Sequence, residues 1–438
     1  MFVRAPVSRA TLACLAAYAP GVPAEGPSST SAPLRARIDS LLTPQRLCVY
    51  PVVLIAMFSL VWLVERLSGS TSLLPDFVAR WTAGRILASG HAAALYSIRE
   101  QAAIQSHLGV RGLSWFVSPP HEAVLLRPLG YLGYDVAAVI WSLASIAMLA
   151  ASFVLFRGAF DKGPRVGWGR SLVLACASQP LLELVGGGQD TAMVLLGFMM
   201  AYRALRRERP LLAGIALSVG LVKPQLMVLA PVYFLARREG RVLLGLGMGA
   251  ATAFVVGLGA GGLPAWVRWG QAVTSPTFQQ SVGTGQAWKS TTVWSLATAL
   301  VPAQLRVAGL VMAGLVAALL VGIALRAWTR RGTELAGLLV SVPLTSVLVA
   351  PHAMVYDLVL VIPGCVVLVT TRATPEVRVG VAAAYVVSWL SPTLHTATFR
   401  LPWPGSAIGG PWVVVPLLAL WCQSVDREER TPYAVRSG

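Results

Sequence analysis

Residues 305–327 read LRVAGLVMAGLVAALLVGIALRA, and only Arg306 and Arg326, one near each end, carry a charge. An α-helix needs about 20 predominantly apolar residues to cross the hydrocarbon core of a bilayer. The stretch therefore predicts a membrane-spanning helix. Because comparable apolar runs recur along the chain, it also decides the predicted fold class, an all-α polytopic membrane protein.

The composition of the 438-residue chain fits this fold class. It is 56% hydrophobic and 12% charged, whereas soluble domains have about 25% charged residues. We assign the net charge of +17 to arginines in cytoplasmic loops. Nucleic-acid binding is not expected, because the basic residues do not form a stripe with interleaved aromatics. The five cysteines contain no Cys-x-x-Cys pair and predict neither a disulfide framework nor a metal site.

About twelve short spans are predicted within a transmembrane domain at 47–424. They are expected near 47–67, 134–156, 171–187, 190–203, 211–222, 224–236, 242–262, 305–327, 335–350, 353–370, 378–391 and 411–424. Several are too short for a full crossing, so partial or broken helices are expected among them. Residues 1–46, rich in Pro, Ser and Ala, are predicted to be a disordered cytoplasmic tail, with a signal sequence as the alternative. Residues 425–438 are predicted to be a second cytoplasmic tail.

The basic residues predict the orientation of the spans. With a cytoplasmic N-terminus and one crossing per run, 24 of the 35 lysines and arginines fall inside, as the positive-inside rule requires. This result depends on a helix break at Lys223-Pro224, since proline disfavours a continuous helix. Two long segments, 68–133 and 263–304, then lie outside. The first has a helical pattern from Asp76 to about Gln105, which could lie along the membrane surface as an amphipathic helix or cap the bundle.

This topology brings the unusual polar residues to one membrane face. Ionisable groups at membrane depth are costly unless they are paired or hydrated, so their convergence predicts a shared polar cavity. The residues are Asp76, Gln189, Asp190, Lys223, His352, Tyr356 and Asp357.

Structural roles are the alternative for each of these residues. Asp76 could cap a helix, and Gln189 and Asp190 could be turn residues after three glycines. Lys223 could extend to the lipid headgroups, and His352 could pair with Asp357 across a helix turn. The glycines of 245–249 are expected at a close helix crossing.

Five groups of short motifs follow one another along residues 70–370. They are Asp76–Arg85 with Leu95-Tyr96, Phe116–Pro120 with Leu125–Leu129, Gly188-Gln189-Asp190, Ala213-Gly214 with Lys223-Pro224, and Pro351-His352 with Tyr356-Asp357. Their order and spacing resemble glycosyltransferase family 87, a family of polyprenyl-phosphate-sugar-dependent membrane enzymes that includes a mycobacterial mannosyltransferase. The sequence departs from the family's pattern at Ser118, directly after Gln189, and at Ala350.

The resemblance implies a GT-C fold with its active site on the extracytoplasmic side. The excess of arginine over lysine indicates a bacterial protein, hence the plasma membrane, and the predicted topology places both termini in the cytoplasm. The resemblance further implies a polyprenyl-phosphate sugar donor, most simply of mannose, and a glycolipid or glycan acceptor of the cell envelope. An acidic residue of the first outer loop acts as the base in such folds, and here that position is Asp76.

The chemistry of a lipid-phosphate donor suggests roles for the other residues. The leaving phosphate needs cations or donors, for which Lys223 and His352 are candidates, with Arg80 as a further one. Gln189, Tyr356 and Asp357 could hold sugar hydroxyls or orient His352, and Asp190 and Tyr96 are further binding candidates. No Asp-x-Asp motif occurs, so we expect no metal and no cofactor.

Two other functions are compatible with the sequence. Broken spans that carry Asp190 and Lys223 also suit a secondary transporter or lipid flippase, although no repeat relates the two halves. The third possibility is a non-catalytic partner in envelope-polymer export.

Overall fold

The structure is a computed structural model that describes residues 57, 60, 74–108, 112–157, 178–285, 287–329, 334–372 and 374–426. Over these residues it is helical, with one isolated β-bridge between Ser290 and Met354 and no strand, so the predicted all-α class is confirmed. Of the predicted span at 47–67 only residues 57 and 60 are described. The tail at 1–46, most of the tail at 425–438 and the beginning of the span at 171–187 lie outside the described residues.

Four described helices are long and apolar enough to cross a membrane. They are α7 (Tyr134–Arg157), α14 (Gly240–Leu258), α18 (Arg306–Trp328, preceded by a short 3-10 turn) and α22 (Pro375–Thr398). Each overlaps a predicted span. Large apolar side chains stay exposed along them, for example Leu143, Leu315 and Val307. Contiguous apolar exposure of this kind fits contact with lipid. The count of twelve spans remains a prediction.

The other apolar runs form shorter helices. These are α9 (Gln179–Gly187), α10 (Thr191–Arg206), α11 (Pro210–Ser218), η2 (Val219–Val222), α12 (Pro224–Met227), α13 (Leu229–Ala236), α19 (Glu334–Leu339), α20 (Ser341–Val349), η5 (Val355–Leu360), α21 (Ile362–Arg372) and α23 (Val414–Asp426). The predicted break at Lys223 is present, because this residue has non-helical dihedrals between η2 and α12. The largest apolar core joins α10–α14 to α18–α23.

Glycines allow two helix pairs to cross closely. A Cβ built at Gly214 of α11 would meet the Val242 carbonyl oxygen of α14, and one at Gly245 would meet the Leu211 carbonyl oxygen. The close crossing predicted for 245–249 is therefore confirmed. Gly84 and Gly130 play the same part at a second crossing, between α4 (Phe77–Ala88) and α6 (Pro120–Gly130).

The first long segment differs from its prediction. Instead of one amphipathic helix from Asp76 to Gln105, α4 ends before Ser89 and Gly90 (φ 82°), and η1 (Ala92–Ala94) and α5 (Ile98–Ser106) follow. Ten of the twelve residues of α4 are buried, so α4 is a core helix of this part. The prediction of a single amphipathic helix is wrong, because α4 packs between α6, α7 and the turn before α10.

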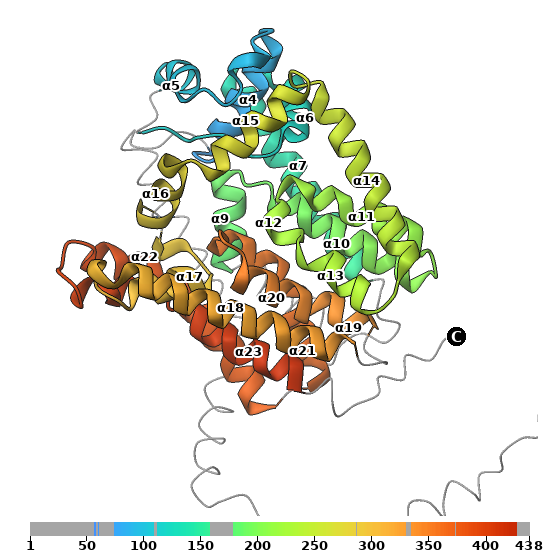
Figure 1. Ribbon diagram of the computed structural model, residues 1–438, viewed down its shortest axis with the longest axis vertical. Coiled ribbons are helices and arrows are strands. Elements are labelled where there is room, and N and C mark those ends of the chain that lie inside the picture. The colour runs from blue at the N-terminus through green and yellow to red at the C-terminus, as the bar shows by residue number, and fades with distance from the viewer. Residues whose placement is uncertain are drawn as a thin grey trace, which may run out of the picture. The chain divides into compact units, whose positions relative to one another are not determined.

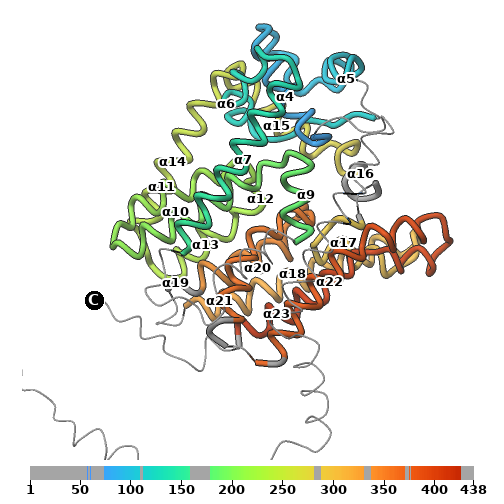
Figure 2. The backbone as a smooth tube through the Cα atoms, turned by 180° about the vertical axis from the view of Figure 1, so that it is seen from behind, coloured from blue at the N-terminus to red at the C-terminus, as the bar shows by residue number. Residues whose placement is uncertain are grey.

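The second long segment packs beside the first. It contains α15 (Leu263–Thr274), α16 (Pro276–Gly285), η3 (Ala287–Lys289) and α17 (Val293–Ala299), and α15 contacts η1, α6 and α14. Both views place α9 between α15 and α20 (Figure 1 and Figure 2). The C-terminal end of α9 is therefore where the two long segments meet the polar breaks between the apolar helices.

Candidate active site

A cavity of about 450 Å³ opens where these segments meet. Its walls come from the start of α4, the extended segment 113–119, the turn before α10, the break before α12, helices α15 and α16, and the loop before η5. The polar side chains among its lining residues are Asp76, Arg80, Ser114, Ser118, Gln189, Lys223, Gln225, Gln279, His352, Tyr356 and Asp357. The structure therefore brings six of the seven converging residues predicted from sequence to one cavity; the seventh, Asp190, lies directly behind it.

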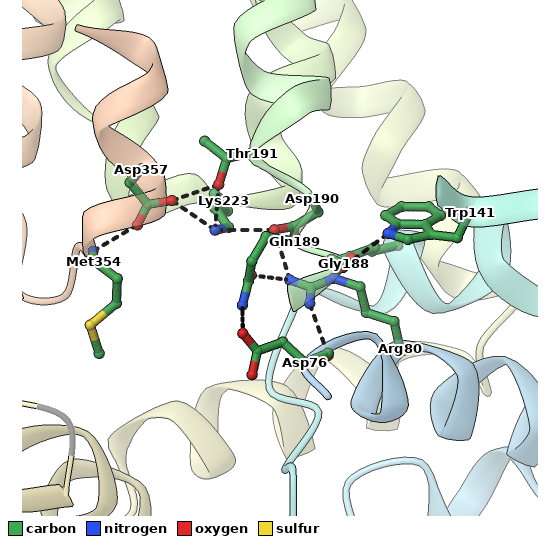
Figure 3. A network of polar contacts seen from close by, with 11 residues as sticks. Asp76, Arg80, Trp141, Gly188, Gln189, Asp190, Thr191, Lys223, Met354 and Asp357 are labelled. Carbon is green, nitrogen blue, oxygen red and sulfur yellow. Dashed lines mark hydrogen bonds and ion pairs between the residues drawn. The ribbon is translucent and has the colours of Figure 1, made fainter. Parts of the chain in front are cut away.

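Asp76 occupies the N-cap position of α4, but its side chain makes no capping hydrogen bond. Its backbone N–H donates to the Gly187 carbonyl oxygen at 3.0 Å. Its carboxylate faces the turn before α10, where Oδ2 accepts a 2.7 Å hydrogen bond from Gln189 Nε2 (Figure 3). The helix-cap alternative thus does not account for the side chain, which is half-buried at the cavity wall.

The turn between α9 and α10 fits closely against α4 because of its glycines. Gly188 has a left-handed conformation (φ 76°), which costs a glycine little. A Cβ at Gly188 would lie 2.7 Å from that of Phe77, and one at Gly187 would lie 2.8 Å from Asp76 Oδ2. The Gly188 carbonyl oxygen accepts from Trp141 Nε1 of α7 at 2.9 Å. This contact holds the turn so that Gln189 and Asp190 face α4.

Arg80 connects Gln189 to two buried carboxylates. Its Nη2 donates to Gln189 Oε1 at 3.2 Å and lies 2.7 Å from Asp190 Oδ1. Its Nε donates to Glu122 Oε1 of α6 at 3.1 Å, and its Nη1 donates to the Asp76 carbonyl oxygen at 3.3 Å. Arg80 is therefore anchored within the protein by three hydrogen bonds and an ion pair.

Lys223 is the second cation that contacts Asp190, on the side away from Arg80. Its Nζ lies 3.1 Å from Asp190 Oδ1, and it donates at 2.8 Å both to Asp357 Oδ1 and to Thr191 Oγ1. The ammonium group thus makes two hydrogen bonds and an ion pair with buried groups, and Lys223 is 7% exposed. The alternative in which it extends to the lipid headgroups is wrong. Asp357 Oδ2 accepts from the Met354 backbone N–H, so Asp357 pairs with Lys223 rather than with His352.

The remaining candidates have less direct roles. Tyr356 is buried, with Lys223 Nζ 4.5 Å from its ring centroid. His352 is half-buried in the cavity wall, edge-on to Phe278 at 6.2 Å between ring centroids. Tyr96 is outside the lining; its hydroxyl donates to the Ser118 carbonyl oxygen at 2.8 Å and thereby supports the segment 113–119.

Two members of the network were not predicted from sequence. Glu122 is 1% exposed, and its pKa is raised to about 8, first by burial and then by the neighbouring Asp190 charge, against the opposing effect of Arg80. Thr191 Oγ1 donates to Asp357 Oδ1 at 2.6 Å. The signal available for Glu122 was Arg80 itself, since a buried arginine in an apolar helix requires a carboxylate nearby.

Among the described residues, no group of His, Cys, Asp and Glu has the arrangement of a metal site. The arrangement offers a carboxylate at the cavity wall, a neutral amide that binds it and a buried ion network behind both. Such a site can accept a proton from a bound hydroxyl group.

The comparison with family models matches residues 116–351 to glycosyltransferase family 87. The matched region is more than half of the chain and includes Gln189, Asp190 and Lys223, whereas Asp76 and Arg80 precede it and His352 follows it. The comparisons with curated proteins and with solved structures give no match.

Proposed function

Because the chain belongs to glycosyltransferase family 87 and is a membrane glycosyltransferase, we propose that it transfers a sugar from a polyprenyl-phosphate donor, with Asp76 as the base. The acceptor is a glycolipid or glycan of the cell envelope, and the sugar is mannose or a close relative. The observation that carries this proposal is the Asp76 carboxylate, which lies at the cavity wall and does not cap its own helix.

The proposed reaction is a single displacement. An acceptor hydroxyl oxygen attacks the anomeric carbon, and the bond between this carbon and the phosphate oxygen breaks. The bonding electron pair leaves with the lipid phosphate, while the hydroxyl proton passes to Asp76. A positioned carboxylate contributes to such a step when it lies within hydrogen-bond reach of the hydroxyl. Attack opposite the leaving group inverts the anomeric centre.

The leaving phosphate is assigned to the His352 side of the cavity. Lys223 and Arg80 are both committed to carboxylates, so we do not assign them direct contact with the phosphate. His352 has no ion pair among the described residues and lines the open cavity, which makes it the candidate for direct contact. Tyr356 and Gln225 lie nearby as possible partners of sugar hydroxyls.

The proposed site faces the extracytoplasmic side of a bacterial plasma membrane. The distribution of arginines supports this orientation, since the predicted inside segments hold most of them. Asp76, Gln189, Lys223 and His352 then share the opposite face.

A donor comparison tests the function. Purified protein in detergent or liposomes is given radiolabelled sugar either on polyprenyl phosphate or on a nucleotide, with membrane lipids as acceptors. We expect label in the lipid or glycan fraction only with the polyprenyl-phosphate donor. Transfer from the nucleotide sugar alone would contradict the proposed donor. Uptake of the lipid-linked sugar into liposomes without transfer would instead support a transporter.

A further inference from the structure

We infer that Gln189 is the positioning residue for the Asp76 carboxylate and that Arg80 in turn fixes the orientation of the Gln189 amide. The inference rests on the proposed function, because it takes Asp76 as the base. It replaces the sequence-based expectation that Gln189 holds sugar hydroxyls or orients His352.

The chemistry of the two partners determines the orientation of the amide. Arginine has only donors, and an ionised carboxylate has only acceptors. The Gln189 side-chain oxygen must therefore face Arg80 and the nitrogen must face Asp76. The structure has this orientation, with 3.2 Å from Arg80 to the oxygen and 2.7 Å from the nitrogen to Asp76 (Figure 3). Reversing the amide would set donor against donor on one side and acceptor against acceptor on the other.

Arg80 is well suited to hold the amide because it is itself immobilised. The Arg80 guanidinium donates hydrogen bonds to Glu122 and to the Asp76 carbonyl oxygen, and it forms an ion pair with Asp190. Its side chain is 9% exposed. A buried guanidinium with these partners cannot turn without leaving carboxylates unpaired, which is costly in a desolvated site.

The neutral amide between Arg80 and Asp76 has a chemical consequence. A carboxylate paired directly with arginine is a weaker base, since the cation favours its ionised form. Here Asp190 forms the ion pair with Arg80 and Glu122 accepts a hydrogen bond from it, while Asp76 receives only a neutral side-chain donor at Oδ2. Its Oδ1 has no hydrogen-bond partner among the described residues and is available to the acceptor hydroxyl. The arrangement holds the carboxylate through a neutral amide instead of through a cation.

Other charged or titratable groups lie around Asp76. They come from each element packed around the site and are Arg80 on α4, Glu122 on α6, Asp190 before α10, Lys223 before α12, and His352, Tyr356 and Asp357 around η5. None of these is altered in the variants below, so a change in the pH profile is assigned to position 189.

Two variants of Gln189 test the inference. Gln189→Met keeps the length of the side chain but removes both hydrogen bonds, and we expect kcat to fall about 10- to 100-fold, with KM changed less than about twofold, because small misplacements of a reacting group are costly. Gln189→Glu keeps the shape and the contact with Arg80 but places a negative charge against Asp76. We expect a similar fall in kcat and a shift of the acidic limb of the kcat/KM profile to higher pH.

The matched control is Gln179→Met. Gln179 is also a buried glutamine, at the start of α9, and is outside the cavity lining. We expect it to keep the wild-type kcat and pH profile, which separates a positioning role from general damage to α9. If Gln189→Met does not insert as a folded protein, the nearly isosteric Gln189→Glu still gives the pH profile.

Wild-type kcat and an unchanged pH profile in both Gln189 variants would overturn the inference while leaving the proposed function intact. A rise in KM at constant kcat would also overturn it, because Gln189 would then bind substrate. Absence of transfer by the wild type from every polyprenyl-phosphate donor would overturn the proposed function and this inference together.

Discussion

At the scale of single residues, the site depends on buried charges that pair across long stretches of sequence. Lys223 joins Asp190 of one turn to Asp357 of another, and Arg80 joins Asp190 to Glu122. Because each of these carboxylates is almost fully buried, removal of one cation leaves a desolvated negative charge behind. Stability and site geometry are therefore linked through the same ion pairs.

Lys223→Met is expected to destabilise the protein by about 3–5 kcal/mol, the usual cost of breaking a buried ion pair. The readout is the midpoint of thermal unfolding in detergent. Lys223→Met combined with Asp357→Asn should be less destabilised than Lys223→Met alone, since asparagine can still accept from the Met354 N–H without carrying a charge. The stability of Asp357→Asn alone completes the comparison. If the double variant loses as much stability as the two single variants together, Lys223 and Asp357 are not coupled.

Glu122→Gln is expected to flatten the pH dependence of stability. Burial raises the Glu122 pKa from an ordinary value of 4.5 to about 8, on a helix that is not among the candidate membrane-spanning ones. The stability that the protonated group contributes is full below pH 4.5 and is lost as the pH rises through about 8. The wild-type unfolding midpoint should therefore fall more steeply from pH 5 to 8 than that of Glu122→Gln.

The neighbouring His121 does not disturb this comparison. Burial lowers its pKa to about 4, but it titrates in both proteins, so its contribution cancels. Equal slopes in the two proteins would contradict the assignment to Glu122.

The sequence predicted the meeting of Asp76, Gln189, Lys223 and Asp357 because polar groups in apolar runs have few acceptable places. It could not predict their pairing. Glu122 becomes the partner of Arg80 only because Gly84 and Gly130 let α4 and α6 cross closely. The Asp76 carboxylate likewise has Gln189 as its side-chain hydrogen-bond partner, a pairing between distant parts of the chain that depends on tertiary packing.

At the scale of helices, hydropathy and proline placed the apolar elements well. Helices α7, α14 and α18 match predicted runs, and the backbone leaves the helix at Lys223 as Pro224 indicates. The first long segment was predicted poorly, because the 3.6-residue pattern of 76–105 does not distinguish an amphipathic surface helix from a helix buried by its neighbours. The left-handed Gly90 ends α4, and the chain turns into η1 and α5.

Gly214→Ala is expected to destabilise the protein by about 1–3 kcal/mol, because the added methyl group meets the backbone of α14. The control is Gly247→Ala in α14, where an added Cβ has nothing within 4 Å and alanine favours the helix. The unfolding midpoint should fall for the first variant and stay constant or rise for the second. Equal midpoints would show that the α11–α14 crossing is looser than described.

At the scale of the whole molecule, the orientation in the membrane connects the site to its proposed substrates. Asp76→Cys, in a background lacking the five native cysteines, should react with a membrane-impermeant maleimide added outside intact cells. A cysteine placed at Arg206, in a predicted inside segment, should react only after the membrane is permeabilised. Labelling of position 76 only after permeabilisation would contradict the predicted topology.

The most direct test of the account is sugar transfer from a polyprenyl-phosphate donor by wild type and by Asp76→Asn in the same membrane-inserted, folded state. Asparagine keeps the size of the side chain but cannot take up the hydroxyl proton, so we predict a loss of at least about 100-fold in kcat, within the usual range for a general base. Thermal unfolding of both proteins in detergent verifies that the variant is folded. Full transferase activity in folded Asp76→Asn would contradict the assignment of Asp76 as the base.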